Sequence, residues 1–341
     1  MIPRLQIIFP LKQQKIFWCG EMYTSRREEY LINHARSGIV MALRAALHYG
    51  GRVGVVAYNC HTVANAIVQA GCTPIFVDVT EDLHIDMTHM AELGIDALVL
   101  TNLFGIRNDV NAIRQVIGEI PIIVDNAHGF GLPNEGDFTV YSINQGKFPA
   151  LGEGGVLVVN NPKYTESIKQ QYIQLPTYSI MQEIKLFITM LIKALMHIPI
   201  VYSYVTMPIK ACRTNVICKE TAPLRQMAKG VQRVYQYALP NIANQIASQL
   251  RQAETIRECL SKQSIVGDLH VGNNAFMAVV KTKEPQSLQQ LLARYGIETS
   301  THFAKSIDWA KQFGYVEGSC PMAERLTKEL IMIPTYKEIR L

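Results

Sequence analysis

Three side chains that can do chemistry together lie close to one another in the sequence. Asp125 ends the apolar segment PIIVD, Ser142 ends the segment FTVYS, and Lys147 follows five residues after the serine. A glycine-rich turn, GEGG at 152–155, comes next and opens a third apolar segment, GVLVV. A lysine amine can form a Schiff base with an aldehyde, a carboxylate can keep a ring nitrogen protonated, and a serine hydroxyl can bind phosphate. These are the groups needed to hold pyridoxal phosphate (PLP).

Each of these residues also has a purely structural interpretation. A single lysine in a loop is usually a solvated surface residue, an aspartate at a strand end often caps a helix or forms a turn, and serine is a common strand residue. The joint spacing of the three favours the chemical interpretation. It predicts Lys147 and Asp125 as catalytic residues and Ser142 as a ligand of the phosphate.

Composition and charge narrow the class of protein. The 341 residues suffice for one large or two modest domains. The formal net charge of +5 is small and unclustered, so we expect no nucleic-acid partner, although it suits an anionic substrate. The seven cysteines are scattered and form no CxxC pair, which indicates reduced thiols in a cytoplasmic protein and no metal site. The early IIFPL run is soon followed by Lys12 and Lys15, which argues against a signal peptide.

The segments that precede Asp125 alternate between two kinds of pattern. Apolar runs of about five residues, typical of buried strands, are separated by helical patterns. The strands are expected at 53–57, 74–78 and 96–100, and the helices at 62–71, 86–93 and 108–117. Such alternation predicts an α/β fold with a mostly parallel sheet, and ligands bind beyond the carboxyl ends of its strands, where Asp125 is placed. No GxGxxG motif follows the first strand, which disfavours a dinucleotide-binding protein.

The order and spacing of the motifs resemble the DegT/DnrJ/EryC1/StrS family of PLP-dependent sugar aminotransferases, in a divergent branch. The family pattern is a strand ending in E-D-A-A-Q/H, then F-S-x-x-x-x-K and G-E-G-G. Here V-D-N-A-H (124–128), Ser142, Lys147 and GEGG stand at the same offsets. Three further stretches resemble family motifs: NAIVQAGCTPIFVDV, GIETSTHF (296–303) and CPMAERLTKELIMIPTY (320–336). The resemblance therefore covers about residues 36 to 337.

The resemblance implies a particular fold and domain organisation. We expect a fold-type-I PLP-dependent transferase, with a mixed, mostly parallel sheet in a large domain and a small C-terminal α/β domain. The large PLP-binding domain is expected at 1–165, an apolar helical connection at 166–220 and the small domain at 221–341.

The resemblance also implies an activity. It indicates a transaminase that moves an amino group from an amino acid to a keto sugar, usually nucleotide-linked, for the synthesis of a cell-surface polysaccharide or glycoconjugate. Lys147 would carry the cofactor and then act as a general base, while Asp125 would keep the pyridine nitrogen protonated. A cytoplasmic homodimer with active sites between its subunits is expected.

The phosphate end of the expected cofactor site lies at a helix N-terminus. Ile39, Leu43 and Leu47 recur at helical spacing after Ser37 and Gly38, and a helix N-terminus binds anions through its free N–H groups and its dipole. The family places S-G-T here, against the phosphate. Ser37 and Gly38 are therefore predicted to bind the cofactor, while Ile39 lacks the hydroxyl group of the family's threonine.

The residues expected at the face of the cofactor ring differ from the family pattern. Cys60 stands at the position of the family's stacking aromatic residue, and Tyr58 or His61 is close enough in sequence to supply the ring. His128 aligns with a family glutamine or histidine beside the cofactor. The complete set predicted to bind PLP is Ser37, Gly38, Cys60, His61, Asp125, His128, Ser142 and Lys147. His302 could reach the substrate, but a buried structural histidine is the favoured interpretation.

Two other functions stay open at this point. A non-catalytic homologue with a scaffolding role would account for Ile39, for Cys60 and for a degraded partner-subunit motif near Arg225. A sugar dehydratase of the same family is disfavoured, since such members carry histidine in place of the lysine. Stoichiometric PLP binding separates an enzyme from a scaffold.

Residues 184–209 form the most apolar stretch of the chain. Its longest uncharged run, 194–209, falls short of the roughly 20 residues that a transmembrane helix needs. We expect it at the surface of the protein, either in peripheral contact with the inner face of the membrane or covered by the partner subunit.

Overall fold

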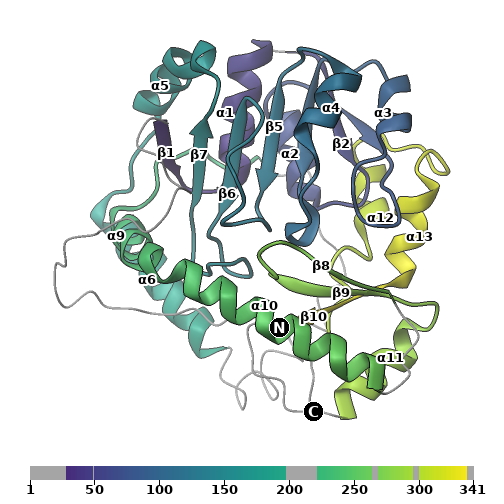
Figure 1. Ribbon diagram of the computed structural model, residues 1–341. Helices are drawn as coiled ribbons and strands as arrows, with labels where there is room; N and C mark the ends of the chain where they lie inside the picture. The colour runs from purple at the N-terminus through teal and green to yellow at the C-terminus, as the bar shows by residue number, and fades with distance from the viewer. Residues whose placement is uncertain (1–27, 49, 197–220, 263–267, 295–298, 336–341) are drawn as a thin grey trace.

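The computed structural model describes residues 28–48, 50–196, 221–262, 268–294 and 299–335 (Figure 1). Two sheets organise these residues, one of seven strands and one of three. In spatial order, the strands of the large sheet are β1 (Glu28–Ile32), β7 (Gly155–Val159), β6 (Phe138–Ser142), β5 (Ile122–Asn126), β4 (Ala97–Thr101), β2 (Arg52–Val56) and β3 (Thr73–Val77).

The large sheet is mixed but mostly parallel. Neighbouring strands from β3 across to β6 pair in parallel, and β7 pairs antiparallel with both β6 and β1. Every residue of β4, β5, β6 and β7 is buried, as expected for strands whose two faces are both covered by helices. The predicted α/β fold is confirmed, and the three expected strands β2, β3 and β4 begin and end within one residue of their predicted bounds.

Helices cover both faces of the large sheet (Figure 1). One face carries a core to which α1 (Ala35–Leu47), α2 (His61–Gln69) and α5 (Thr165–Gln174) contribute. The other face packs against α3 (Met87–Glu92), α4 (Val110–Ile117) and α9 (Lys229–Ala238). The side chains of Asp86 and Asp109 accept hydrogen bonds from the first N–H groups of α3 and α4 and so fix where these helices begin.

Helix α1 is the most deeply embedded helix at the site. It begins at Ala35, after an extended His34, so Ser37 and Gly38 lie within its first turn rather than at its start. A Cβ atom at Gly38 would lie 2.9 Å from side-chain atoms of both Ile32 and Val140. The missing side chain therefore lets the helix lie close against the sheet.

The small sheet comprises β8 (Asp268–Val271), β9 (Met277–Lys281) and β10 (Leu330–Pro334), all antiparallel. Helices α10 (Ile242–Lys262) and α11 (Pro285–Arg294) share its apolar core. This confirms a small C-terminal sheet beside the large one, while the expected domain boundaries at 165 and 220 stay a prediction. The two sheets are joined at Asp78, whose carboxylate accepts the backbone N–H groups of Met322 and Ala323 at the start of α13 (Pro321–Glu329).

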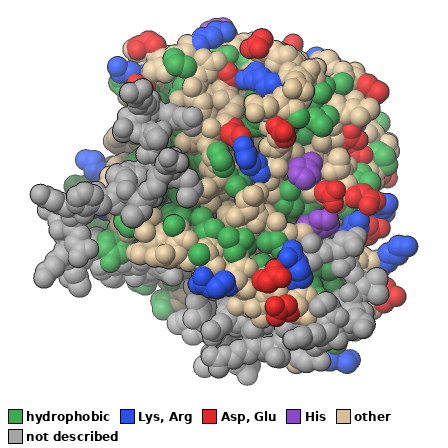
Figure 2. Space-filling model, viewed as in Figure 1, with side chains coloured by type: hydrophobic (Ala, Val, Ile, Leu, Met, Phe, Trp, Pro, Cys, Tyr) green, Lys and Arg blue, Asp and Glu red, His purple; other side chains and the backbone are tan. Residues whose placement is uncertain are grey.

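Helix α6 (Ile180–Leu195) has no buried residue, although it begins with a capping box formed by Ser179 and Gln182. Its exposed apolar side chains are Ile180, Met181, Ile184, Phe187, Ile188, Leu191, Ile192 and Leu195. In Figure 2, hydrophobic side chains are spread over much of the visible face, among charges of both signs that are most frequent in its upper and right-hand parts.

Part of the apolar stretch expected at the surface is thus seen there. Residues 184–195 lie on α6, whereas 197–209 lie outside the described residues. Among the helices that the structure describes, none is long and apolar enough to cross a membrane.

Candidate active site

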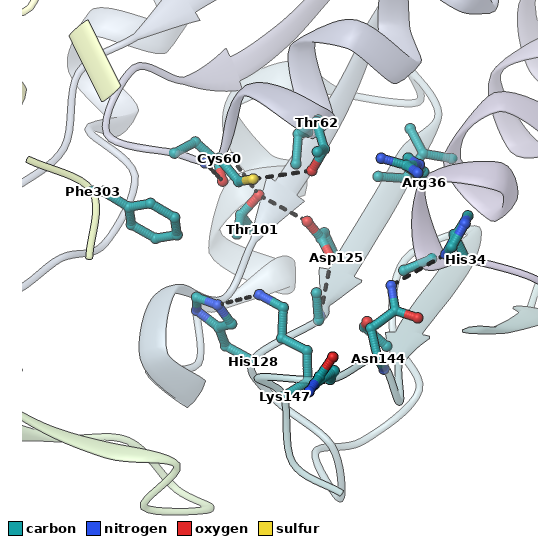
Figure 3. A pocket seen from close by; sticks show the side chains of 17 residues that line it. His34, Arg36, Cys60, Thr62, Thr101, Asp125, His128, Asn144, Lys147 and Phe303 are labelled. Carbon is teal, nitrogen blue, oxygen red and sulfur yellow. Dashed lines mark hydrogen bonds between the residues drawn. The ribbon is translucent and has the colours of Figure 1, made fainter. Parts of the chain in front are cut away.

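A pocket of about 200 Å³ opens where the carboxyl ends of three strands meet the start of α1 (Figure 3). Thr101, Asp125 and Ser142 come from the ends of β4, β5 and β6. This is the edge at which open α/β sheets bind ligands. The complete lining is His34, Ala35, Arg36, Ile39, Asn59, Cys60, Thr62, Val63, Thr101, Asp125, Ala127, His128, Ser142, Asn144, Gln145, Lys147 and Phe303.

Lys147 reaches the pocket from the turn after β6, where its backbone N–H donates to the carbonyl oxygen of Asn144. Its Nζ lies 2.6 Å from Nε2 of His128. Burial lowers the pKa of Lys147, against the opposing effects of Cys60 and Asp125. A lysine with a lowered pKa keeps more of the neutral amine, which is the nucleophilic and basic form.

His128 is buried among aromatic rings beside the lysine. Its ring stacks on Phe104, Phe276 and Phe303, with centroids 5.4, 5.0 and 5.6 Å away. Burial lowers the pKa of His128 well below its ordinary value, and the neighbouring Lys147 lowers it further. Because Nδ1 accepts the Phe104 backbone N–H at 3.2 Å, the proton of the neutral ring belongs on Nε2, which faces the lysine amine.

The Phe104 backbone that supplies this hydrogen bond is unusual. Its φ of 52° lies in the left-handed region that favours glycine. Backbone strain of this kind persists only where the surrounding contacts hold it. Here the Phe104 ring is fully buried and stacked on His128, so strain and packing together fix the donor that sets the histidine tautomer.

Asp125 lies in the floor of the pocket and is almost completely buried. Its Oδ1 accepts the Ala127 backbone N–H at 3.0 Å, and its Oδ2 lies 3.5 Å from the Thr101 hydroxyl. Burial raises the pKa of Asp125, although these hydrogen bonds and Lys147 oppose the shift. A cationic ring nitrogen beside the carboxylate would offset the cost of burying its charge.

The start of α1 forms the opposite end of the pocket. His34 Nδ1 lies 3.3 Å from Nδ2 of Asn144, whose Oδ1 accepts the Gly154 backbone N–H at 2.8 Å. Burial lowers the pKa of His34, and so does the neighbouring Arg36. Ser142 Oγ faces the pocket and accepts the Asn144 backbone N–H at 3.4 Å.

Glycines of the GEGG turn let this end form. A Cβ atom at Gly155 would lie 2.4 Å from the backbone nitrogen of Ala35, and Gly154 has a φ of 150° that other residues rarely adopt. Gly152, with a φ of 106°, lies under Met190 of α6. The turn therefore lets β7 lie close to the start of α1 and lets α6 pack on the turn.

Five of the eight residues predicted to bind the cofactor line this one pocket: Cys60, Asp125, His128, Ser142 and Lys147. Ser37, Gly38 and His61 do not. The Ser37 hydroxyl donates to Asn33 at 2.8 Å and Gly38 faces the sheet. His61 lines a neighbouring small cavity and contacts the ring of Trp309 edge-on, with centroids 5.2 Å apart.

The sequence reasoning missed other lining residues, among them Arg36, Thr101 and Phe303. Thr101 directly follows the strand predicted at 96–100 and ends β4, so the rule that ligands bind beyond strand ends could have included it. Arg36 directly precedes Ser37, which is predicted to bind the cofactor, and no local sequence pattern indicates which of the two side chains faces the pocket. Tyr58, which could have supplied the aromatic ring that stacks on the cofactor, is instead buried in the core against Phe303.

The residues present fit PLP on the observations above. A buried amine with a lowered pKa, a buried carboxylate with no cation hydrogen-bonded to it, and a serine beside a helix start surround one cavity. These match the three demands of the cofactor: its aldehyde, its ring nitrogen and its phosphate.

The sequence is similar to those of known aminotransferases. The sequence model of the DegT/DnrJ/EryC1/StrS aminotransferase family matches residues 23–183 and 227–341. The chain is 28% identical over 193 residues to dTDP-4-amino-4,6-dideoxy-D-glucose transaminase of Shigella dysenteriae, covering 49% of this chain and 51% of that one. It is also 28% identical over 151 residues to Protein Rv3402c of Mycobacterium tuberculosis, covering 37% of each. The match thus spans about half or less of the length of these curated relatives.

The fold also resembles that of solved structures. The structure of the sugar aminotransferase CalS13 from Micromonospora echinospora superposes with a TM-score of 0.67 at 16% sequence identity, covering 90% of this chain and 82% of that one. At this identity the likeness concerns the fold.

Proposed function

Because the chain belongs to the DegT/DnrJ/EryC1/StrS aminotransferase family, we propose that it is a PLP-dependent aminotransferase that transfers an amino group from an amino acid to the keto carbon of a sugar. The Shigella relative is named for a dTDP-linked sugar, and we extend a nucleotide-linked substrate to this chain. Its product would enter the synthesis of a cell-surface polysaccharide or glycoconjugate.

One observation carries the proposal. The Lys147 amine, the Asp125 carboxylate and the Ser142 hydroxyl, which come from different loops and strands, line a single pocket with the start of α1. Lys147 would hold the aldehyde of PLP, Asp125 the protonated ring nitrogen, and Ser142 the phosphate. A lysine with a purely structural role would not need a buried carboxylate, a serine hydroxyl and a helix start around the same pocket.

When bound, PLP supplies a protonated ring that accepts the electrons of a carbanion. Lys147 would then act as the general base for the 1,3-proton shift. Its lowered pKa favours the neutral amine, so Nζ can accept the proton. His128 would orient that amine, since its Nε2–H points at the lysine nitrogen while Phe104 holds Nδ1. The stacked phenylalanines on His128 would keep water from this end of the pocket.

The assignment is tested by trapping the cofactor. The protein should be incubated with PLP, reduced with borohydride, digested and analysed by mass spectrometry. The pyridoxyl phosphate mass should appear on the peptide that holds Lys147 and vanish in Lys147→Ala. Lys169→Ala, which removes an exposed lysine of α5, should label like the wild type. Label on other lysines alone would refute the assignment, and a failure to bind PLP stoichiometrically would support the scaffolding alternative.

We further propose that the protein acts in the cytoplasm as a homodimer, and that the partner subunit covers α6. The described cysteines Cys60, Cys72 and Cys320 form no disulfide, which supports a reducing compartment. Soluble proteins rarely leave an apolar patch of more than a few hundred Å² uncovered, and the apolar side chains of α6 are exposed.

Two measurements decide what covers α6. Light scattering should give the mass of a dimer, and replacing Ile188 and Leu191 by glutamate should give the monomer. Flotation of the wild-type protein with anionic vesicles, abolished by the same substitutions, would instead assign the helix and the rest of 184–209 to a membrane surface.

A further inference from the structure

The helix end of the pocket holds a cationic side chain that the proposed chemistry leaves unused. Arg36 lies in the first turn of α1, lines the pocket, and is partly buried. Its Nε is fully buried and has no hydrogen-bond partner, and none of its guanidinium atoms forms an ion pair with the residues that the structure describes. A buried N–H donor without an acceptor costs free energy, so the unpaired Nε–H of Arg36 indicates that a ligand accepts its hydrogen bond.

The position of Arg36 identifies the kind of acceptor. Figure 3 shows Arg36 and His34 on the side of the pocket away from His128 and Phe303. The first N–H groups of a helix lack an acceptor one turn earlier and the helix dipole favours an anion here, although the Ser37 N–H already donates to the carbonyl oxygen of His34 at 3.0 Å. Ser142, on the same lining, adds a hydroxyl group. Donors from a guanidinium, a helix start and a serine suit a phosphate group.

Arg36 also supplies a fixed positive charge at this end. Burial lowers the pKa of His34, and so do the nearby Arg36 and Lys193, so this histidine is neutral at physiological pH. Glu153, the acid that acts on His34, is engaged by the hydroxyl group of Tyr178. A guanidinium keeps its charge under all these conditions.

The sequence around the helix start lacks the usual hydroxyl ligands. His34, just before α1, and Ala35 and Arg36 in its first turn line the pocket, while the Ser37 hydroxyl donates to Asn33. We propose that Arg36 binds the phosphate of PLP through its guanidinium and replaces the hydroxyl contact of the family's S-G-T motif. This inference rests on the proposed function.

The test compares PLP with pyridoxal, which has the same ring and aldehyde but no phosphate. Binding to the apoprotein should be measured from the absorbance of the captured ligand. Arg36→Gln should raise the Kd for PLP about 10- to 100-fold, the effect of losing charged hydrogen bonds, and leave the Kd for pyridoxal unchanged. Arg36→Lys, which keeps the charge but not the planar fork, should fall between Arg36→Gln and the wild type.

Two controls address folding and surface charge. Arg251→Gln removes an exposed arginine of α10 and should bind both ligands like the wild type. In the wild-type apoprotein, inorganic phosphate should compete with PLP and not with pyridoxal, which needs no variant at all.

The outcomes separate this inference from the proposed function. Equal PLP affinity in Arg36→Gln and the wild type, or an equal loss of PLP and pyridoxal affinity, would overturn the role of Arg36 while Lys147 still captures PLP. A failure of the wild-type protein to attach PLP to Lys147 would overturn the proposed function itself. Competition of inorganic phosphate with both ligands would also contradict a dedicated phosphate site at Arg36.

Discussion

The two ends of the pocket solve opposite electrostatic problems. At the lysine end, formed by Lys147, His128 and the phenylalanines stacked on it, the key polar atoms have partners and burial drives the bases toward their neutral forms. At the helix end, formed by His34, Ala35 and Arg36 with Ser142, a buried guanidinium nitrogen has no partner. One end is complete without a ligand, and the other is not.

The difference follows from what each end is proposed to do. A base must be neutral when it accepts a proton, and a dry aromatic surrounding lowers the pKa of an amine or an imidazole. An anion site must offer positive charge and unused donors, and it gains by keeping them unpaired until the ligand arrives. Asp125 lies between the ends, with its charge disfavoured by burial until a cation joins it.

The largest effect is expected at the lysine end. Lys147→Ala should lower amino transfer by more than about 10³-fold, since it removes both the attachment point and the proton carrier. The readout is the rate at which an amino acid is consumed by the PLP-loaded protein. PLP should still bind reversibly, because the helix end is intact. Equal loss of reversible PLP affinity in this variant and in Arg36→Gln would mean that the two ends do not work separately.

Asp125→Asn should have the next largest effect, lowering amino transfer about 10²-fold, because it keeps the shape of the carboxylate and removes its charge. The same rate assay measures it. The unfolding free energy of the apoprotein should not fall, since the carboxyl group with its raised pKa is already costly to bury as an anion. A rate within threefold of the wild type would show that the ring nitrogen has no need of the acid.

The neutral histidines predict a dependence of stability on pH. Burial and the nearby Lys147 lower the pKa of His302 to about 3 from an ordinary 6.5. Because the unfolded chain takes up the proton first, the unfolding free energy is highest above about pH 6.5 and falls as the pH drops toward 3.

Urea unfolding of the apoprotein at pH 7.5 and pH 5.0 measures this loss. His302→Gln should reduce the loss between these pH values by about 2 kcal/mol, the linkage for 1.5 pH units. Thr301→Ala, a change at an exposed neighbour that does not titrate, should leave the loss as it is. An unchanged pH dependence in His302→Gln would mean that its imidazole is solvated.

A further substitution sharpens the role assigned to His128. His128→Phe keeps the aromatic stack but removes the Nε2–H donor, and it should slow the capture of pyridoxal by Lys147 about tenfold. His128→Gln, which restores an N–H donor, should recover most of the rate. If both variants are equally slow, the histidine acts through packing alone, and the proton on Nε2 has no role.

The smallest effect is expected at Ser37. Ser37→Ala should leave PLP affinity within twofold of the wild type, because its hydroxyl donates to Asn33 and not into the pocket. It should cost about 1 kcal/mol of unfolding free energy through the lost hydrogen bond. A tenfold loss of PLP affinity would return the phosphate site to Ser37.

Ser37 also shows where sequence reasoning reaches its limit. The spacing of Ile39 and Leu43 revealed a helix and its buried face, but a helix begins before its first apolar residue. The start at Ala35 turns Arg36 toward the pocket and Ser37 toward Asn33. A shift of one position on a helix rotates a side chain by roughly 100°, which also separates Cys60 from His61.

The strand ends were easier to predict. The apolar runs that end at Asp125 and Ser142 are buried parallel strands, and their carboxyl ends meet at one edge of the sheet, so the two residues came together as expected. Phe303 is different, because it reaches the pocket from a region that follows α10 and α11. No local sequence pattern predicts a contact between residues so far apart in the chain. The cover of α6 likewise depends on another surface, which the sequence of one chain does not describe.

The GEGG turn has a consequence for how this sequence tolerates change. Each of its glycines is held by a different neighbour: Gly152 by Met190, Gly154 by Ile143 and Met227, and Gly155 by the backbone of Ala35. In a saturation library, shortening Met190 should relieve only the steric contact at Gly152, since its φ of 106° still disfavours any other residue. Gly155 should accept nothing, because its neighbour is main chain. The glycines that look like one motif are thus separate constraints, each imposed by different neighbours.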